Sequence, residues 1–118
     1  MTRSILLFAE DPGAANYIAP LPELLSARGW HPRLLACAAG AQQLARLGIS
    51  FEKMGPKAAG AVPEQALVVV GTSENPESPA FELIQAAREC GIPSIGVVDG
   101  PGHAVFRFRG QGYAPLDQ

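Results

Sequence analysis

Residues 4–13 read SILLFAEDPG, a run of apolar residues that gives way to two acids, a proline and a glycine. Every residue from Ile5 to Ala9 is apolar, so the run lacks the alternation typical of a strand with one solvated face. A strand of this kind is covered on both faces, as in a parallel sheet. Asp is a favoured N-cap residue and Pro suits the first helical position, so Asp11 and Pro12 predict a helix directly after the strand.

The same order of strand and helix continues along the chain. Pro20 and Pro22 interrupt the first helical pattern, which runs to Arg28, so we expect a kinked helix or two short helices in series. Gly29 is its natural stop. Further helices are predicted at 41–47 and from the Ser78-Pro79 start signal to Gly91. We expect a loop with at most a short helical turn at 55–63. Further strands are predicted at 33–37, 49–54, 66–70 and 93–98.

Strands that alternate with helices in this way predict βαβ crossovers and a parallel sheet. We therefore expect an α/β fold, a three-layer Rossmann-like sandwich with a five-stranded, mostly parallel sheet. Right-handed crossovers and the long connection between the third and fourth strands favour the strand order 3-2-1-4-5. The whole of residues 1–118 is expected to form a single domain.

Composition narrows the classes of protein. With 118 residues, 47% of them apolar and 17% charged, the chain has enough apolar material for one core and too little charge for a disordered protein. A net charge of −2 gives no overall basic field for nucleic acid. Cys37 and Cys90 belong to no zinc-binding motif, so we expect two free, mostly buried thiols in a reducing, cytoplasmic setting. No apolar run is long enough for a signal peptide or a membrane span.

Ligands of open parallel sheets bind at the carboxyl ends of the strands, where the strand order reverses. In the expected order this point lies between the first and fourth strands. After the first strand, Gly13 and Asn16 are candidate ligand-binding residues, and Asp11 is a candidate catalytic base or hydroxyl-binding group. The alternative is that Asp11 is an ordinary N-cap. The loop has neither the GxGxxG nor the P-loop pattern, so no nucleotide cofactor is predicted.

The fourth strand is followed by Gly71, Thr72 and Ser73, which offer close backbone approach and two hydroxyl groups for a ligand. A polar turn that leads to the next helix is the alternative. Glu74 and Glu77 are a pair of loop carboxylates with no third ligand, so no metal site is predicted.

The fifth strand is followed by the most unusual stretch. His103 is a candidate general acid or base because its ordinary pKa lies near neutrality. Arg107 and Arg109 fall on one side of an extended segment and are candidates to bind phosphate, with Asp99 and Gly100 at the strand end. The alternative is a solvated loop whose arginines pair with nearby carboxylates.

Several of these stretches together resemble a known family. The resemblance rests on four stretches: ILLFAEDPGAAN at 5–16, the helix end RGWHP at 28–32, the strand at 66–71 and GIPSI at 91–95. With them the chain looks like the N-terminal half of a GT-B glycosyltransferase, an architecture that the UDP-N-acetylglucosamine 2-epimerases share. The resemblance implies a role with glycans or sugar nucleotides. In such enzymes the N-terminal domain mainly holds the acceptor, and the C-terminal domain holds the sugar-nucleotide donor.

On that resemblance the chain is incomplete as an enzyme on its own, and glycosyltransferase-like if a second domain or subunit completes it. Two alternatives stay open. One is a stand-alone Rossmann-like protein, as a monomer or homodimer, that binds a nucleotide or other anionic metabolite. The other is an interaction module without a small-molecule site. The expected partners are therefore a second domain, a subunit or a second copy, and a small anionic or sugar ligand, without nucleic acid.

Overall fold

The fold is taken from a computed structural model that describes residues 3–55, 58–71 and 77–97. The elements follow one another as β1 (Ser4–Ala9), α1 (Pro12–Ile18), α2 (Leu21–Ala27), β2 (His31–Ala36), α3 (Ala38–Arg46), β3 (Glu52–Lys53), the 3₁₀ helix η1 (Ala58–Glu64), β4 (Leu67–Gly71), α4 (Ala80–Glu89) and β5 (Ser94–Val97).

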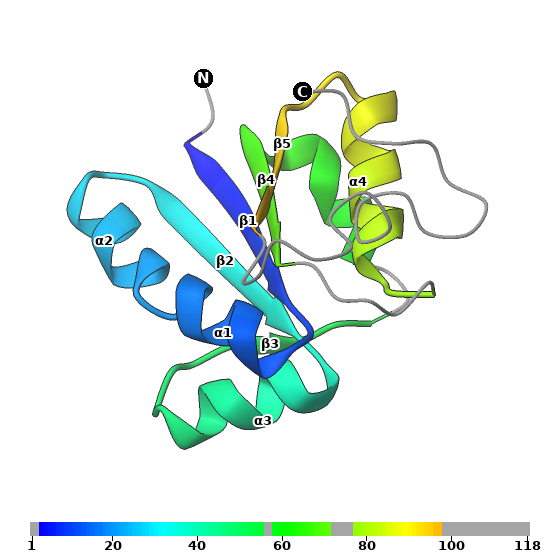
Figure 1. The fold of residues 1–118 in the computed structure, drawn as a ribbon. Coiled ribbons are helices and arrows are strands. Elements are labelled where there is room, and N and C mark those ends of the chain that lie inside the picture. Colours follow the sequence, from blue (N-terminus) through cyan, green and yellow to red (C-terminus); the bar gives the residue numbers. More distant parts are fainter. Residues whose placement is uncertain (1–2, 56–57, 72–76, 98–118) are drawn as a thin grey trace.

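Within the described residues the strands form one sheet in the order β3-β2-β1-β4-β5, and every neighbouring pair is parallel (Figure 1). The predicted α/β class and strand order are confirmed. β1 is the central strand, and Phe8 lies between Leu35 of β2 and Val70 of β4. The order reverses between β1 and β4, as the sequence predicts.

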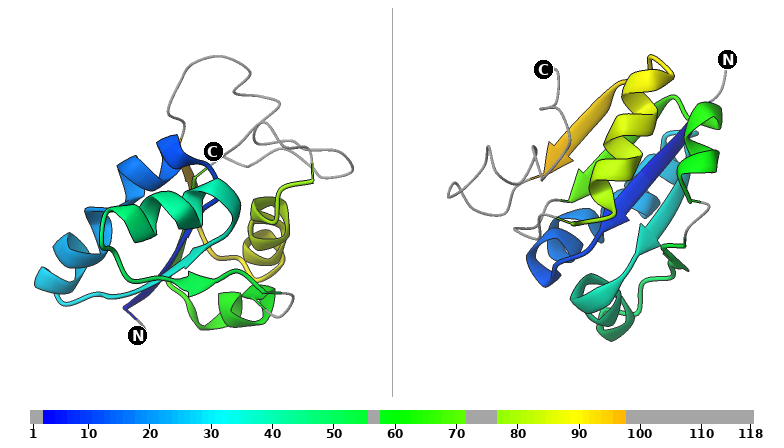
Figure 2. Two further views of the ribbon diagram at one scale, coloured as in Figure 1. Left: turned by 90° about the horizontal axis from the view of Figure 1, so that it is seen from below. Right: turned by 90° about the vertical axis from the view of Figure 1, so that its right-hand side faces the viewer.

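Helices cover both faces of the sheet, so the fold has the three expected layers (Figure 2). Ile5 and Leu7 of β1 face α1, α2 and α3, whereas Leu6 and Phe8 face α4 and η1. All four side chains are buried. Because alternate residues meet an apolar layer on either side, β1 is apolar at every position from Ile5 to Ala9.

The first helical segment is divided, as the two prolines predict. α1 ends at Ile18 and α2 begins at Leu21, with Pro20 at the start of α2. Gly29 follows α2 with φ of +84°, a conformation that glycine adopts without a Cβ clash. Tyr17 of α1 and Leu24 of α2 have the apolar side chains expected of a buried helix face, but both are exposed.

The third strand is much shorter than the predicted 49–54, because only Glu52 and Lys53 pair with β2. Ile49 and Phe51 instead pack their side chains against the core on the α1 side of the sheet. α3 begins at Ala38, three residues before the predicted start, and the predicted loop at 55–63 contains η1.

The expectation of two mostly buried thiols is wrong for Cys90. Cys37 is half-buried, but Cys90 follows the last turn of α4 and is exposed. Across the described ranges, no helix has the length and apolar character needed to cross a membrane.

Candidate functional site

The candidate site is the edge of the sheet where β1 and β4 end. Asp11 and Gly13 of the turn into α1 lie at this edge together with Gly71, the last residue of β4. The parallel register explains this, because Phe8 pairs with Val70 and both strands end within a residue or two of that pair. The fold therefore brings together the described candidates of the first and fourth strands.

Asp11 occupies the N-cap position of α1 with extended backbone angles, as predicted. Its carbonyl oxygen accepts a hydrogen bond from the Ala15 amide at 2.9 Å, the first bond of the helix. Within the described part of the chain, however, its carboxylate accepts no capping hydrogen bond from the first turn. The half-buried Asp11 side chain therefore does not perform the ordinary N-cap function.

Asn16 and Gly71 have structural partners. The Asn16 Oδ1 accepts a hydrogen bond of 2.9 Å from Gln43 Nε2, which joins α1 to α3. A Cβ at Gly71 would lie 2.5 Å from the Ala14 Cβ and 3.1 Å from the Ile18 Cδ1, so the glycine lets α1 pack closely on the end of β4. Close packing of the helix accounts for Gly71 without a ligand.

The other candidates fall in stretches that the structure does not describe. These are Thr72 and Ser73 after β4, and Asp99, Gly100, His103, Arg107 and Arg109 after β5.

Two buried polar residues at this edge were not among the predicted site residues. Glu10 and Ser78 are 7% and 4% exposed, and Ser78 Oγ donates a hydrogen bond of 2.5 Å to Glu10 Oε1. The same Ser78 oxygen accepts a hydrogen bond of 3.2 Å from the Ala80 amide at the start of α4. One signal could have drawn attention to Glu10. It directly follows the apolar strand and has the same side-chain direction as Leu6 and Phe8, toward the α4 side of the sheet.

The backbone of Glu10 is held as firmly as its side chain. Its carbonyl oxygen accepts a hydrogen bond of 2.6 Å from the Gly40 amide in the first turn of α3. A Cβ at Gly40 would lie 2.7 Å from the Glu10 carbonyl carbon, so only glycine permits this approach. The sharp turn out of β2 includes Ala38 at φ of +52°, a left-handed conformation that alanine seldom adopts.

Two sulfur-bearing residues, Cys37 after β2 and Met54 after β3, pack against the core on the α4 side of the sheet. Burial raises the pKa of the Cys37 thiol, and the negative charges of Glu10 and Asp11 raise it further. The thiolate is the reactive form of cysteine, so Cys37 is a poor nucleophile at neutral pH.

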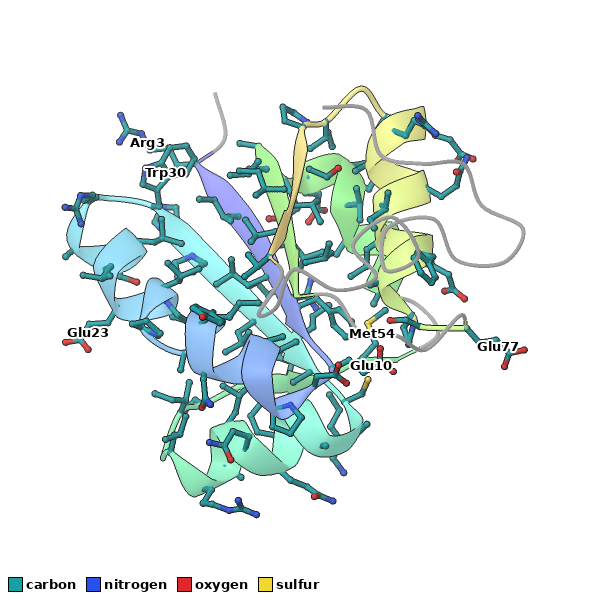
Figure 3. All side chains as sticks on the ribbon, in the orientation of Figure 1. Arg3, Glu10, Glu23, Trp30, Met54 and Glu77 are labelled. Atoms are coloured by element: carbon teal, nitrogen blue, oxygen red, sulfur yellow. The ribbon has the colours of Figure 1, made fainter. Side chains whose placement is uncertain are left out.

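The described residues at the reversal point carry negative charge. Among the described residues between β1 and α1 and immediately before α4, Glu10, Asp11 and Glu77 are acidic and none is basic. Figure 3 shows Glu77 pointing away from Glu10. In the described ranges, no group of three or more His, Cys, Asp and Glu side chains is placed to hold a metal ion. The chemistry available here is that of carboxylates, which accept hydrogen bonds from hydroxyl and amide groups.

Comparison with known proteins adds no family: neither a protein-family model nor a curated protein matches this chain.

Proposed function

We propose that this chain is the acceptor-side, Rossmann-like domain of a GT-B type glycosyltransferase, and that it binds the hydroxyl groups of a saccharide between β1 and β4. The observation that supports this most is the acidic turn after β1. Its Glu10 carboxylate is buried and hydrogen-bonded, and the next residue, Asp11, places a second, half-buried carboxylate at the start of α1.

The charge of this turn favours a neutral ligand over an anionic one. Carboxylates accept hydrogen bonds from sugar hydroxyls, and such charge-assisted bonds are stronger than neutral ones. A phosphate at the same place would be repelled by Glu10 and Asp11. The sugar acceptor therefore fits the described residues better than the diphosphate of a sugar nucleotide, which the resemblance assigns to a second domain.

In this proposal Asp11 accepts a hydrogen bond from one acceptor hydroxyl and orients it. When a donor domain supplies the activated sugar, the same carboxylate acts as the general base that takes the hydroxyl proton while the acceptor oxygen bonds to the anomeric carbon of the donor sugar. The bond from that carbon to the nucleoside diphosphate breaks, and the diphosphate leaves on the donor domain.

The test is a titration of the ¹⁵N-labelled chain, followed by NMR, with N-acetylglucosamine, a chitin disaccharide, UDP-N-acetylglucosamine and inorganic phosphate. We expect a saccharide to cause saturable shifts in the amides of Asp11, Gly13 and Gly71. Asp11→Asn should weaken that binding about tenfold, because a bond to a charged acceptor is replaced by one to a neutral amide. Glu23→Gln is the matched control, since Glu23 is exposed on α2 and lies far from Glu10 in Figure 3.

Three results would contradict the proposal. If no saccharide causes a saturable shift, the chain has no acceptor site of the proposed kind. If Asp11→Asn binds saccharide as tightly as the wild-type chain, Asp11 does not take part in binding. Saturable binding of phosphate, or of UDP-N-acetylglucosamine without binding of either saccharide, would instead support the anionic-metabolite alternative.

A further inference from the structure

One hydrogen bond crosses the reversal point of the sheet. Glu10 directly follows β1, and Ser78 directly precedes the turn into α4, 68 positions along the chain. Their side chains meet at 2.5 Å, and both residues are more than nine-tenths buried. A buried hydroxyl that donates to a buried carboxylate makes a strong contact, because hydrogen bonds to an ionised acceptor are stronger than those between neutral groups.

The bond connects three elements through one residue. The Glu10 side chain is joined to the entrance of α4 by Ser78, and its carbonyl oxygen is joined to α3 by the Gly40 amide. Asp11 is the next residue, and its own carbonyl oxygen starts α1 by accepting from Ala15. Whatever fixes Glu10 therefore also restricts the backbone of Asp11, from which the Asp11 carboxylate projects.

We propose that Ser78 is a positioning residue for the candidate site, which acts through Glu10 to hold the β1–α1 turn and so orient Asp11. The purpose of this positioning rests on the proposed function, but the positioning itself does not require a ligand. A simpler role for Ser78 is to cap α4 alone, since its oxygen also accepts from the Ala80 amide. The two roles predict loosening in different places.

Amide hydrogen exchange of the ligand-free chain separates them. The Gly40 and Ala15 amides report on the β1–α1 turn, because they bond to the carbonyl oxygens of Glu10 and Asp11. The Ala80 amide reports on the start of α4. The Ile49 amide, bonded to Leu44 at the far end of α3, is the internal reference.

In Ser78→Ala we expect the Gly40 and Ala15 amides to exchange at least about tenfold faster relative to Ile49, because a hydrogen bond to a buried charge is lost. Ser78→Thr keeps the hydroxyl and should restore exchange at both positions. In a Glu10→Ala background, Ser78→Ala should change neither amide further, which shows that Ser78 acts through Glu10.

Faster exchange at Ala80 alone, or an equal increase at every amide, would overturn the proposal in favour of a cap or a general stabilising role. If Ser78→Ala does not fold, Ser78→Cys keeps a similar size with a weaker donor and is assessed in the same way. The saccharide titration is separate. Absence of saccharide binding would reject the proposed function, and the exchange pattern would still decide whether Ser78 positions the turn.

Discussion

Replacing Gly71 by alanine tests the contact between α1 and the end of β4. The added methyl group would lie 2.5 Å from the Ala14 Cβ, 3.1 Å from the Ile18 Cδ1 and 3.2 Å from the Phe8 carbonyl oxygen. Carbon atoms in good contact are separated by about 3.5–4.0 Å, so α1 and β4 must move apart by about 1 Å. Rotation of a side chain cannot relieve the first contact, because the Ala14 Cβ is fixed by the helix backbone.

The cost can be bounded from these distances. One extra methyl group in a well-packed core typically destabilises a protein by about 1–3 kcal/mol. Exchange of glycine for alanine restricts the unfolded chain and offsets about 0.4–1 kcal/mol of this. The difference between these two ranges is about 0–2.6 kcal/mol. Because the contact of 2.5 Å with the Ala14 Cβ is far closer than carbon atoms normally approach, Gly71→Ala should fall in the upper part of that range and lower the free energy of unfolding by about 2 kcal/mol.

Urea unfolding followed by circular dichroism measures this difference. Gly60→Ala is the matched control, because Gly60 is exposed and a Cβ there meets nothing within 4 Å. Ala14→Gly should destabilise the wild-type chain by about 1–2 kcal/mol, through lower helix propensity and the loss of a buried methyl group. In the Gly71→Ala background it removes the closest contact and should cost much less. A Gly71→Ala variant as stable as wild type, or the same cost of Ala14→Gly in both backgrounds, would refute this account of the packing.

Arg33 holds the pKa of Glu52 below its usual range through a hydrogen bond of 2.8 Å. The pair therefore stabilises the fold at pH values above the pKa of Glu52 in the unfolded chain. This stabilisation is lost as the pH falls through the lower pKa of Glu52 in the folded protein. Since both side chains are about half exposed, Glu52→Gln should cost less than about 1 kcal/mol at about pH 7 and nothing at about pH 2, as measured by urea unfolding. Iodoacetamide at neutral pH should modify Cys37 about tenfold more slowly than the exposed Cys90, because burial and the nearby acids disfavour the Cys37 thiolate. Asp11→Asn should speed the labelling of Cys37 and leave Cys90 unchanged, as measured by mass spectrometry of the labelled peptides.

Specific results would contradict the expectations for Glu52 and for Cys37. An equal loss of stability in Glu52→Gln at both pH values would show that the pair acts by packing and not by charge. Labelling of Cys37 at the rate of Cys90 would show that the edge of the sheet is far more open than its burial indicates.

The central part of the fold could be predicted because its signals are local. β1 contains the whole apolar run from Ile5 to Ala9 and ends with it, since a charged pair follows Ala9. The division between α1 and α2 also follows from local chemistry, because proline removes an amide donor and restricts the residue before it.

The edges of the fold could not be predicted in the same way. The length of β3 depends on how much of the segment pairs with β2, and its apolar residues Ile49 and Phe51 satisfy a strand pattern while they pack elsewhere. The early start of α3 depends on Ala38 at positive φ. Glycine or asparagine is the usual residue at positive φ, so an alanine at this position gives no sequence signal for the turn.

The candidate site was located by topology and only partly by residue. Asp11 stands where the strand order predicts a ligand, but the contact of Glu10 with Ser78 joins residues 68 positions apart, which a single sequence does not reveal. Gly71 illustrates the opposite case. Its presence at a strand end suggests a ligand, whereas the structure accounts for it by the approach of α1.

The central place of β1 has a consequence for synthesis of the chain. Ile5 pairs with Pro32 on one side and with Leu67 on the other, so one edge of the strand finds its partner early and the other only after β4 has been made. Until then a nascent chain presents an unpaired, wholly apolar strand edge, the kind of surface on which unfinished proteins aggregate. Long-range parallel pairing is also slow to form. The arrangement that places Asp11 at the middle of the finished sheet therefore leaves the N-terminal half dependent on the later synthesis of β4. Until β4 has been made, β1 is a strand to which a ribosome-bound chaperone is expected to bind.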